Sequence, residues 1–490
     1  MRQRLQKLLF GRGDGRQTAL KNFAWLSASN TGSRFLKALI TIYAARRLGA
    51  ESYGVFSYAL GLAGFFIFFK NIGIDAILTR EVAKRPGEEH RYFSTALAIE
   101  IVLLVITAVL VIFVAPFFSK LDEAIMLLPF VALILIFDDL KDLFVAFFRG
   151  KEKMELEAVV VVIANLSVVV LGFLALRYFS TPLALTASYA VASMLGVLAA
   201  IALLRPFVSG IIRNFDRNLV APMLKSAWPI AVGGFASLFL FNVDIVMLGW
   251  WKTAHEIGLY SAAQRVVGIL SLLPLLVATT ALPVFSRFAH AGEGEKIRST
   301  METILSVLSM ISLPLVVGGV ILRESLLGFV FGPDYIPAAG AFVILLISIP
   351  AAYFMPVLYN LLFAFDKQAK SVSYAIAASL CNVLLNFLLI PKYGILGAAF
   401  ATSSASLLYT ALMWRLGKKM HNFRILPSSL KVICSAFAMG AVVFLLQRSG
   451  LHVIANIGIS AAFYFSLLYL LKERAVAEMF SLIRPFSANS

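Results

Sequence analysis

The sequence predicts an all-α polytopic membrane protein with about 14 membrane-spanning helices, and three observations support this prediction. Of the 490 residues, 60% are hydrophobic and only 14% are charged, whereas soluble domains average about 45–50% apolar and about 25% charged residues. The apolar residues form blocks of about 18–25 residues, each long enough to cross a hydrocarbon core of about 30 Å. The blocks show no strict alternation of polar and apolar positions, which excludes the strands of a membrane barrel.

Fourteen apolar segments make up the predicted spans, and Pro or Gly interrupts many of them. Membrane helices tolerate such residues when neighbouring helices satisfy the freed backbone groups. The predicted spans are 20–44, 53–69, 92–115, 124–148, 156–176, 183–204, 222–250, 258–282, 300–322, 339–363, 371–390, 396–414, 430–446 and 453–471.

The basic residues are distributed unevenly between the two sides of these spans. With the N-terminus in the cytoplasm, the cytoplasmic segments and adjoining span ends hold 31 Lys and Arg residues, and the outward segments hold 8. This bias predicts that both termini lie in the cytoplasm and that the protein resides in the cytoplasmic (inner) membrane. The net charge of +17 follows from this topology, so we expect no nucleic-acid partner.

The connecting segments leave no room for a soluble catalytic domain, because none exceeds about 25 residues. The sequence has neither a GxxxxGK[ST] phosphate loop nor an HExxH zinc motif. Its five His residues are scattered over loops and span edges, and Cys381 and Cys434 lie far apart. We therefore expect a protein that is not an enzyme and that has no cofactor other than a coupling ion, Na⁺ or H⁺.

An internal repeat divides the chain into two lobes. With an ungapped shift of 204 residues, AESYGVFSYALGLAG (50–64) aligns with AHEIGLYSAAQRVVG (254–268), and five of the fifteen positions are identical. Six predicted spans separate the repeat starts, so the copies are parallel six-helix lobes related by a pseudo-two-fold axis along the membrane normal. The predicted domains are a basic N-terminus (1–19), an N-lobe (20–210), a C-lobe (211–420) and a C-terminal helix pair with its tail (421–490).

Besides Lys141, three cations lie well inside predicted spans, where a charge is costly. Arg34 is near the middle of the first span, and Lys37 follows three residues later on the same helix face. Arg265 lies one to two turns into the span 258–282. A cation at such a depth costs at least about 2.5–3.5 kcal/mol and usually faces a water-filled path or a partner. We therefore expect these three side chains to line a cationic cavity that binds an anionic group such as phosphate.

Acidic residues within the spans provide an alternative role for the cations. Glu100 and the group Asp138–Asp142 also fall inside predicted spans. In this alternative, Arg34 and Lys37 form structural ion pairs with these acids. The structural interpretation is favoured for Lys141, because it lies among the acids in the sequence.

A second polar constellation lies in the predicted C-lobe. Asp244 is in the span 222–250, Asn382 and Asn386 lie one turn apart on one face of a later span, and Thr402 is in the next. Carboxylate, amide and hydroxyl oxygens suit a small hard cation such as Na⁺. The alternative is that the Asn and Thr side chains join helices by hydrogen bonds.

Several segments, by their order and spacing, resemble the polysaccharide-transporter branch of the multidrug/oligosaccharidyl-lipid/polysaccharide exporter superfamily, which includes the O-antigen flippases. The resemblance covers roughly residues 20–420. It rests on LGAESYGVFSYA (48–59), GIDAILTREVAKRP (73–86), NVDIVMLG (242–249), EIGLYSAAQRVVGILSLLP (256–274) and NVLLNFLLIPKYGILGAAFAT (382–402).

This resemblance implies a flippase that turns an oligosaccharide on a polyprenyl pyrophosphate from the cytoplasmic to the outer leaflet. Arg34 and Arg265 match cavity arginines of the related lipid II flippase. Asp244, Asn382, Asn386 and Thr402 match its cation site, except that Asn386 stands where a second carboxylate is expected. The last two spans resemble a pair that lines a groove for the lipid tail.

Other functions remain open at this point. The span 53–69 lacks an arginine expected in a lipid II flippase, so the resemblance favours a polysaccharide precursor over lipid II. A drug/cation antiporter of the same superfamily, a membrane glycosyltransferase or polymerase, and a non-transporting scaffold are the alternatives. The expected partners are the lipid-linked oligosaccharide, membrane lipid and the polymerase or ligase machinery of polysaccharide synthesis.

Overall fold

The computed structural model describes residues 15–66, 72–205, 214–271, 273–424 and 426–473. Over these residues the chain is helical and has no strand, so the predicted all-α class is confirmed. Nine of the described helical segments are long and apolar enough to cross a membrane. The figure of about 14 spans stays a prediction.

The helices divide into two compact units, each formed by its own internal contacts. Unit 1 comprises residues 1–238 and 253–258, and unit 2 comprises residues 239–252 and 259–490. The predicted lobe limits stay predictions. The helix α10 (Arg217–Trp251) contributes residues to both units, and α11 (Ala254–Leu270) does the same.

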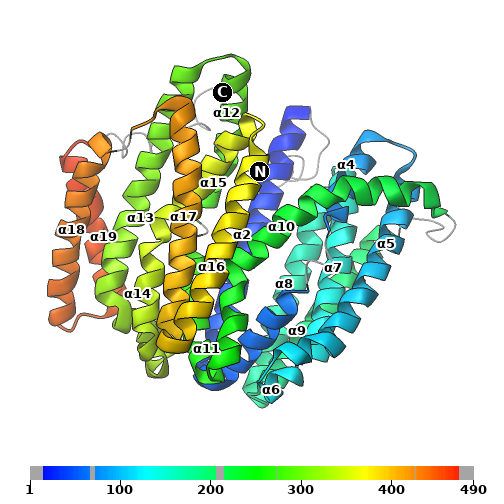
Figure 1. The fold of residues 1–490 in the computed structure, drawn as a ribbon, viewed down its shortest axis with the longest axis horizontal. Coiled ribbons are helices and arrows are strands. Elements are labelled where there is room, and N and C mark those ends of the chain that lie inside the picture. The colour runs from blue at the N-terminus through cyan, green and yellow to red at the C-terminus, as the bar shows by residue number, and fades with distance from the viewer. Residues whose placement is uncertain (1–14, 67–71, 206–213, 272, 425, 474–490) are drawn as a thin grey trace, which may run out of the picture. The chain divides into compact units, whose positions relative to one another are not determined.

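Unit 1 is a bundle of long helices (Figure 1). Its core is formed by buried residues such as Phe93 of α5, Phe147 and Phe148 of α7 and Val160 of α8. The elements of unit 1 before α10 are α2 (Gly15–Gly64), α4 (Ile74–Lys84), α5 (Glu89–Val109), η1 (Leu110–Val114), η2 (Ala115–Phe118), α6 (Asp122–Ile125), α7 (Leu128–Gly150), α8 (Met154–Tyr178) and α9 (Pro182–Leu204).

Unit 2 is a second bundle, which ends in a helical hairpin packed on α13. Met310 of α13, Met439 of α18 and Tyr464 of α19 belong to one buried cluster. The elements of unit 2 after α11 are α12 (Leu273–His290), α13 (Gly294–Phe331), η4 (Pro333–Ala338), α14 (Ala339–Ile347), α15 (Ile349–Ala364), α16 (Gln368–Tyr393), α17 (Ile395–His421), α18 (Leu426–Arg448) and α19 (Val453–Leu470).

One predicted span boundary differs from the structure. The spans 20–44 and 53–69 both carry the label α2, but a kink at Gly49, where φ is 72° and ψ is 172°, separates them as two helices. Glycine tolerates this positive φ because it has no Cβ. The predicted span 258–282 is divided between α11 and α12. Pro274, the second residue of α12, lacks the N–H that a continuing helix would need.

A predicted loop contains the helix α4. Its apolar residues Ile74, Ile77, Leu78 and Val82 are all buried, and they recur at the spacing of one helix face. Arg80 and Lys84 of the same segment are exposed, whereas Glu81 is buried. The segment is therefore an amphipathic helix whose apolar face covers one end of unit 1.

The helices α2 and α11 approach each other in unit 1 at two glycines that the internal repeat pairs. A Cβ added to Gly54 would lie 1.8 Å from the carbonyl oxygen of Ala254, and one added to Gly258 would lie 1.8 Å from that of Ala50. Small residues allow such backbone contact between membrane helices. The identities found at repeat positions thus include the residues that make this crossing.

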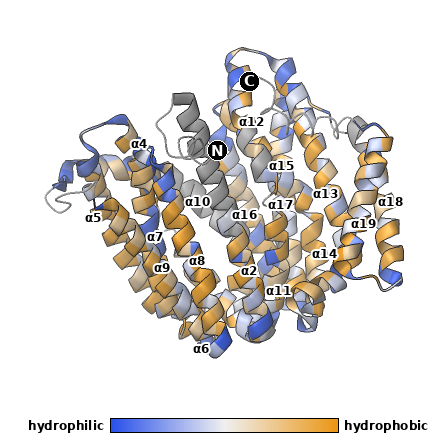
Figure 2. Cartoon of the chain, turned by 180° about the vertical axis from the view of Figure 1, so that it is seen from behind, coloured by the Kyte–Doolittle hydropathy of each residue, from blue (hydrophilic) through white to orange (hydrophobic). Residues whose placement is uncertain are grey.

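The outer faces of the helices are apolar. Large exposed side chains include Val102, Phe113, Leu380 and Phe437, each more than half exposed. Figure 2 shows hydrophobic residues along the flanks of the helices and hydrophilic residues mainly at their ends. In water such a surface would be an aggregation liability, whereas in a bilayer it faces lipid. The chain is a multi-span membrane protein.

Candidate functional site

The predicted cationic residues lie on two different units. Arg34 is part of α2, but its side chain lies outside the described residues. Lys37, one turn further along α2, is exposed, and its carbonyl oxygen accepts a hydrogen bond from Thr41 Oγ1 at 2.7 Å. Arg265 of α11 is exposed as well. A cavity that joins these residues therefore stays a prediction.

On the face of α2 that carries Lys37, the residues that follow it along the helix are buried. Thr41, Ala44 and Ala45 are buried, with exposures of 7%, 1% and 0%, whereas Lys37 is exposed. A lysine within a membrane helix is stable when water reaches its ammonium group. Lys37 is therefore not a buried residue, and its place in a hydrated cavity stays a prediction.

Lys141 forms ion pairs with neighbouring acids, which is the structural role expected for it. Its ammonium group lies 3.0 Å from Asp138 Oδ1 and 3.4 Å from Asp142 Oδ1, and the residue is 9% exposed. The pairing with neighbouring acids on α7 is confirmed. Lys141 therefore balances charge within unit 1.

The polar constellation of unit 2 is centred on Asp244, which is 1% exposed. Thr402 Oγ1 donates a hydrogen bond to its Oδ2 at 3.0 Å, and the hydroxyl of Tyr260 donates a second one to the same oxygen. The backbone N–H of Ile245 donates to Oδ1 at 3.0 Å. Gln264 Nε2 lies 3.4 Å from Oδ2.

The groups that donate hydrogen bonds to the Asp244 carboxylate are all neutral among the described residues. No lysine or arginine in the described part of the chain forms a salt bridge with it. A carboxylate buried in this way needs a proton, a cation or several donors. The hydroxyl oxygens of Tyr260 and Thr402, 3.3 Å apart, could bond an ion that binds to the carboxylate.

Asn382 and Asn386 form a second polar pair on α16. Asn386 Nδ2 donates to Asn382 Oδ1 at 2.8 Å, which confirms that they share one helix face. Both residues are fully buried. Within the described residues, Asn386 Oδ1 and Asn382 Nδ2 have no hydrogen-bond partner. The structure therefore joins Thr402 to Asp244 and Asn382 to Asn386, but no hydrogen bond described here joins the two pairs.

Tyr260 and Gln264 were missed as site residues from the sequence. Both lie in the segment EIGLYSAAQRVVG, one turn apart on α11. A tyrosine in an apolar helix usually reads as a core residue. The useful signal was the i, i+4 spacing of two polar side chains within a membrane span, which places them on one face.

An apolar cavity of about 370 Å³ lies within unit 2. Its walls come from α11, α13, α14, α18 and α19, and they are polar only at Ser460 and Tyr464. The Tyr464 hydroxyl donates to the carbonyl oxygen of Met310 at 2.9 Å, which leaves the wall chemically apolar. Such a cavity suits a hydrocarbon chain.

The helical membrane fold and two family profiles place the chain in the multidrug/oligosaccharidyl-lipid/polysaccharide exporter superfamily. The profile of the family described as "Polysaccharide biosynthesis protein" matches residues 19–289, and that of the MatE family matches residues 229–388. The chain belongs to the polysaccharide biosynthesis protein family.

Curated relatives agree with this assignment. The chain is 24% identical, over 77% of its length and 79% of the relative's, to the "Probable low-salt glycan biosynthesis flippase Agl15" of Haloferax volcanii. It is 23% identical to the "Capsular polysaccharide biosynthesis protein CapF" of Staphylococcus aureus, over 78% of this chain and 94% of that one.

Solved structures share the fold at low sequence identity. The lipid II flippase MurJ in an inward closed conformation has a TM-score of 0.77 at 17% identity, covering 91% of this chain and 98% of that one. An inward-facing multidrug resistance MATE transporter has a TM-score of 0.64 at 15% identity, covering 82% of this chain and 98% of that one.

Proposed function

We propose that this protein is a flippase that moves a polyprenyl-pyrophosphate-linked oligosaccharide from the cytoplasmic to the outer leaflet of the cytoplasmic membrane. The observation that supports this most directly is the exposure of Lys37 and Arg265, two cations in apolar helices. Cations within membrane helices usually face a water-filled path or a partner, and such a path suits an anionic cargo. A pyrophosphate supplies that anion, and Arg265 offers the planar fork that bonds phosphate oxygens.

The cargo would be held in three chemically different environments. Arg34, Lys37 and Arg265 would attract the pyrophosphate, and the sugars would follow in water. The prenyl chain would occupy the apolar cavity lined by α13, α18 and α19. A polysaccharide polymerase or ligase on the outer side would then consume the sugar.

Direction would come from an ion gradient or the membrane potential. Asp244 with Tyr260 and Thr402 would bind the coupling ion, Na⁺ or H⁺, with Asn382 and Asn386 nearby on α16. Asn386 supplies an amide oxygen where a second carboxylate would strengthen Na⁺ binding. A unit charge that crosses the membrane changes in free energy by about 2.3 kcal/mol per 100 mV.

Deletion of the gene tests the proposed function. Lipid-linked oligosaccharide should then accumulate on the inner leaflet, where reagents added outside do not reach it, and the parent gene should restore its exposure. Normal exposure of the lipid-linked sugar in the deletion strain would reject the proposal. Restoration by a lipid II flippase alone would point to lipid II as the cargo.

The coupling ion is tested separately. Transport by the reconstituted protein is measured with Na⁺ replaced by K⁺, with and without a pH gradient, for the parent and for Asp244→Asn. Dependence on Na⁺ or on the pH gradient that Asp244→Asn abolishes supports the site. A parent that depends on neither ion would rule out ion binding at Asp244 as the source of direction.

A further inference from the structure

Basic side chains gather at the end of unit 1 where α4 is followed by α5. Arg80 lies on α4, Arg85 caps its C-terminus, Arg91 lies in the first turn of α5, and Arg149 lies in the last turn of α7. Figure 1 shows α4, the start of α5 and the start of α10 at this end of the bundle. In Figure 2 the hydrophobic flank of the helices gives way here to hydrophilic residues.

The acidic partners of these arginines lie deeper than the arginines themselves. Arg80 and Arg85 share Glu81, and their side chains are 46% and 53% exposed against 11% for the glutamate. Arg149 is 44% exposed, whereas its partner Glu157 is 4% exposed. In these pairs the guanidinium groups are exposed, and the balancing carboxylates of Glu81 and Glu157 lie beneath them.

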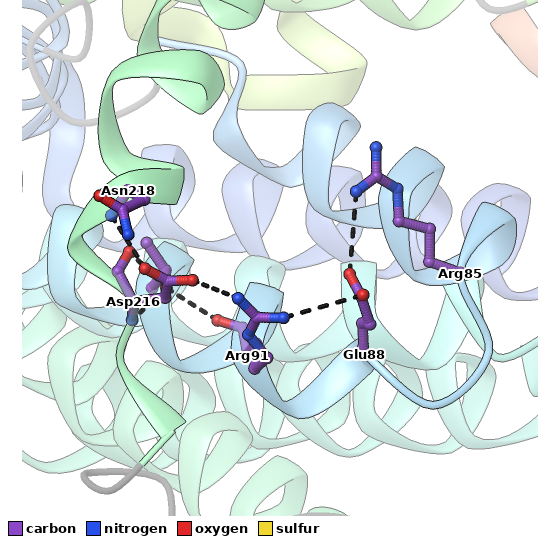
Figure 3. Close-up of polar contacts among 6 residues, drawn as sticks. Arg85, Glu88, Arg91, Asp216 and Asn218 are labelled. Atoms are coloured by element: carbon purple, nitrogen blue, oxygen red, sulfur yellow. Dashed lines mark hydrogen bonds and ion pairs between the residues drawn. The ribbon is translucent and has the colours of Figure 1, made fainter.

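Glu88 is the exception, because it lies between two of the arginines at the surface (Figure 3). It is 44% exposed, and its carboxylate oxygens lie 3.7 Å from Arg85 Nη1 and 3.7 Å from Arg91 Nη1. These separations exceed a hydrogen bond, and exposed ion pairs of this kind are weak. A phosphate group could therefore compete with Glu88 for both arginines.

Other contacts hold the two arginines in place. Arg91 is paired through Nη2 with Asp216, whose Oδ1 also accepts a hydrogen bond from the N–H of Asn218 at 2.9 Å. The guanidinium of Arg85 lies over the ring of Tyr92, 5.4 Å from its centroid. A stacked guanidinium keeps its N–H groups available at the edge. These contacts hold the guanidinium groups of Arg85 and Arg91 in place, and N–H groups at their edges can still donate to a phosphate.

We propose that this surface, made of Arg80, Arg85, Arg91 and Arg149, binds the phosphate groups of anionic membrane phospholipids. Guanidinium groups bond two phosphate oxygens at once, and the surface lies where the apolar flank of the bundle ends, which is where we expect lipid head groups. The positive-inside bias predicts that this end faces the cytoplasm, whose leaflet carries anionic lipid. A phospholipid fits better than a soluble phosphate, because its acyl chains also cover the apolar flank.

The experiment measures binding of fluorescent dioctanoyl phosphatidylglycerol to the purified full-length protein in neutral detergent, with dioctanoyl phosphatidylcholine as the neutral probe. The parent should prefer phosphatidylglycerol, and the preference should fall with added salt. Arg85→Gln should weaken binding by about fivefold, the effect expected for one basic residue near a lipid surface. Glu88→Gln should strengthen binding, because it removes the competing carboxylate.

The matched control is Arg323→Gln in unit 2, where the glutamate partner is more exposed than the arginine, 57% against 44%. It should leave binding unchanged. If the Arg85–Glu88 pair served only to stabilise the protein, Arg85→Gln and Glu88→Gln would act in the same direction. That result would overturn the proposal. So would a parent protein without a preference for phosphatidylglycerol, or an equal loss of binding in Arg323→Gln. Displacement of the lipid by equimolar inorganic pyrophosphate would overturn it as well.

Discussion

The carboxylate of Asp244 accepts a hydrogen bond from the hydroxyl of Tyr260, a residue of the following helix. Thr402 donates to the same carboxylate oxygen from α17. Three helices of unit 2 therefore meet at one buried charge. Any ion that binds there has to replace these donors or bond to their hydroxyl oxygens.

Replacement of Tyr260 by Phe should destabilise the protein. It removes a donor from a fully buried carboxylate, a change that costs about 1–3 kcal/mol. Thermal unfolding in detergent measures it. The control is Tyr353→Phe, whose hydroxyl donates only to the neutral carbonyl of Leu270 at 2.9 Å and should cost less. A Tyr260→Phe protein as stable as the parent would show that the hydroxyl does not stabilise Asp244.

The crossing of α2 and α11 should not accept a larger residue. In Gly54→Ala the new methyl would lie 1.8 Å from the Ala254 carbonyl oxygen, so the helices must separate, at a cost of about 1–3 kcal/mol or more. Gly268→Ala, on α11 with nothing within 4 Å, should be neutral or slightly stabilising. Equal unfolding temperatures for the two variants would contradict the close approach.

Loss of Lys141 should reduce stability rather than substrate binding. Lys141→Ala removes the ammonium group that lies 3.0 Å from Asp138 and 3.4 Å from Asp142, and we expect a loss of about 1–3 kcal/mol. This is below the value for a fully buried pair, because both carboxylates are partly exposed. Protein abundance in the membrane and unfolding in detergent report the effect. Normal abundance with loss of transport would instead assign Lys141 to the cargo.

The pair of Arg91 and Asp216 should weaken in acid. The hydrogen bond from Arg91 holds the pKa of Asp216 below its ordinary value of 3.8, with help from the Asn218 N–H. A lowered folded-state pKa gives stability that is present above 3.8 and lost as the pH falls through the lowered value. Asp216→Asn should therefore lower the unfolding temperature equally at pH 7 and 5, and the difference should shrink below pH 3.8. A difference that grows in acid would contradict this assignment.

Sequence patterns predicted the helical membrane fold and some local pairings, because these depend on neighbouring residues. The pairing of Lys141 with Asp138 and of Asn386 with Asn382 follows from spacings of one helical turn. The role of Tyr260 could not be predicted, since its contact with Asp244 depends on how two helices pack.

Transport by the purified protein in liposomes tests the central proposal most directly. A fluorescent polyprenyl-pyrophosphate oligosaccharide is placed in both leaflets, and its exposure to an external, membrane-impermeant quencher is followed over time. We expect transbilayer movement with the parent and with the Arg323→Gln control, and none with Arg265→Ala, although that variant should reconstitute equally well. Equal movement with Arg265→Ala, or none with the parent while a lipid II flippase acts normally, would contradict the account.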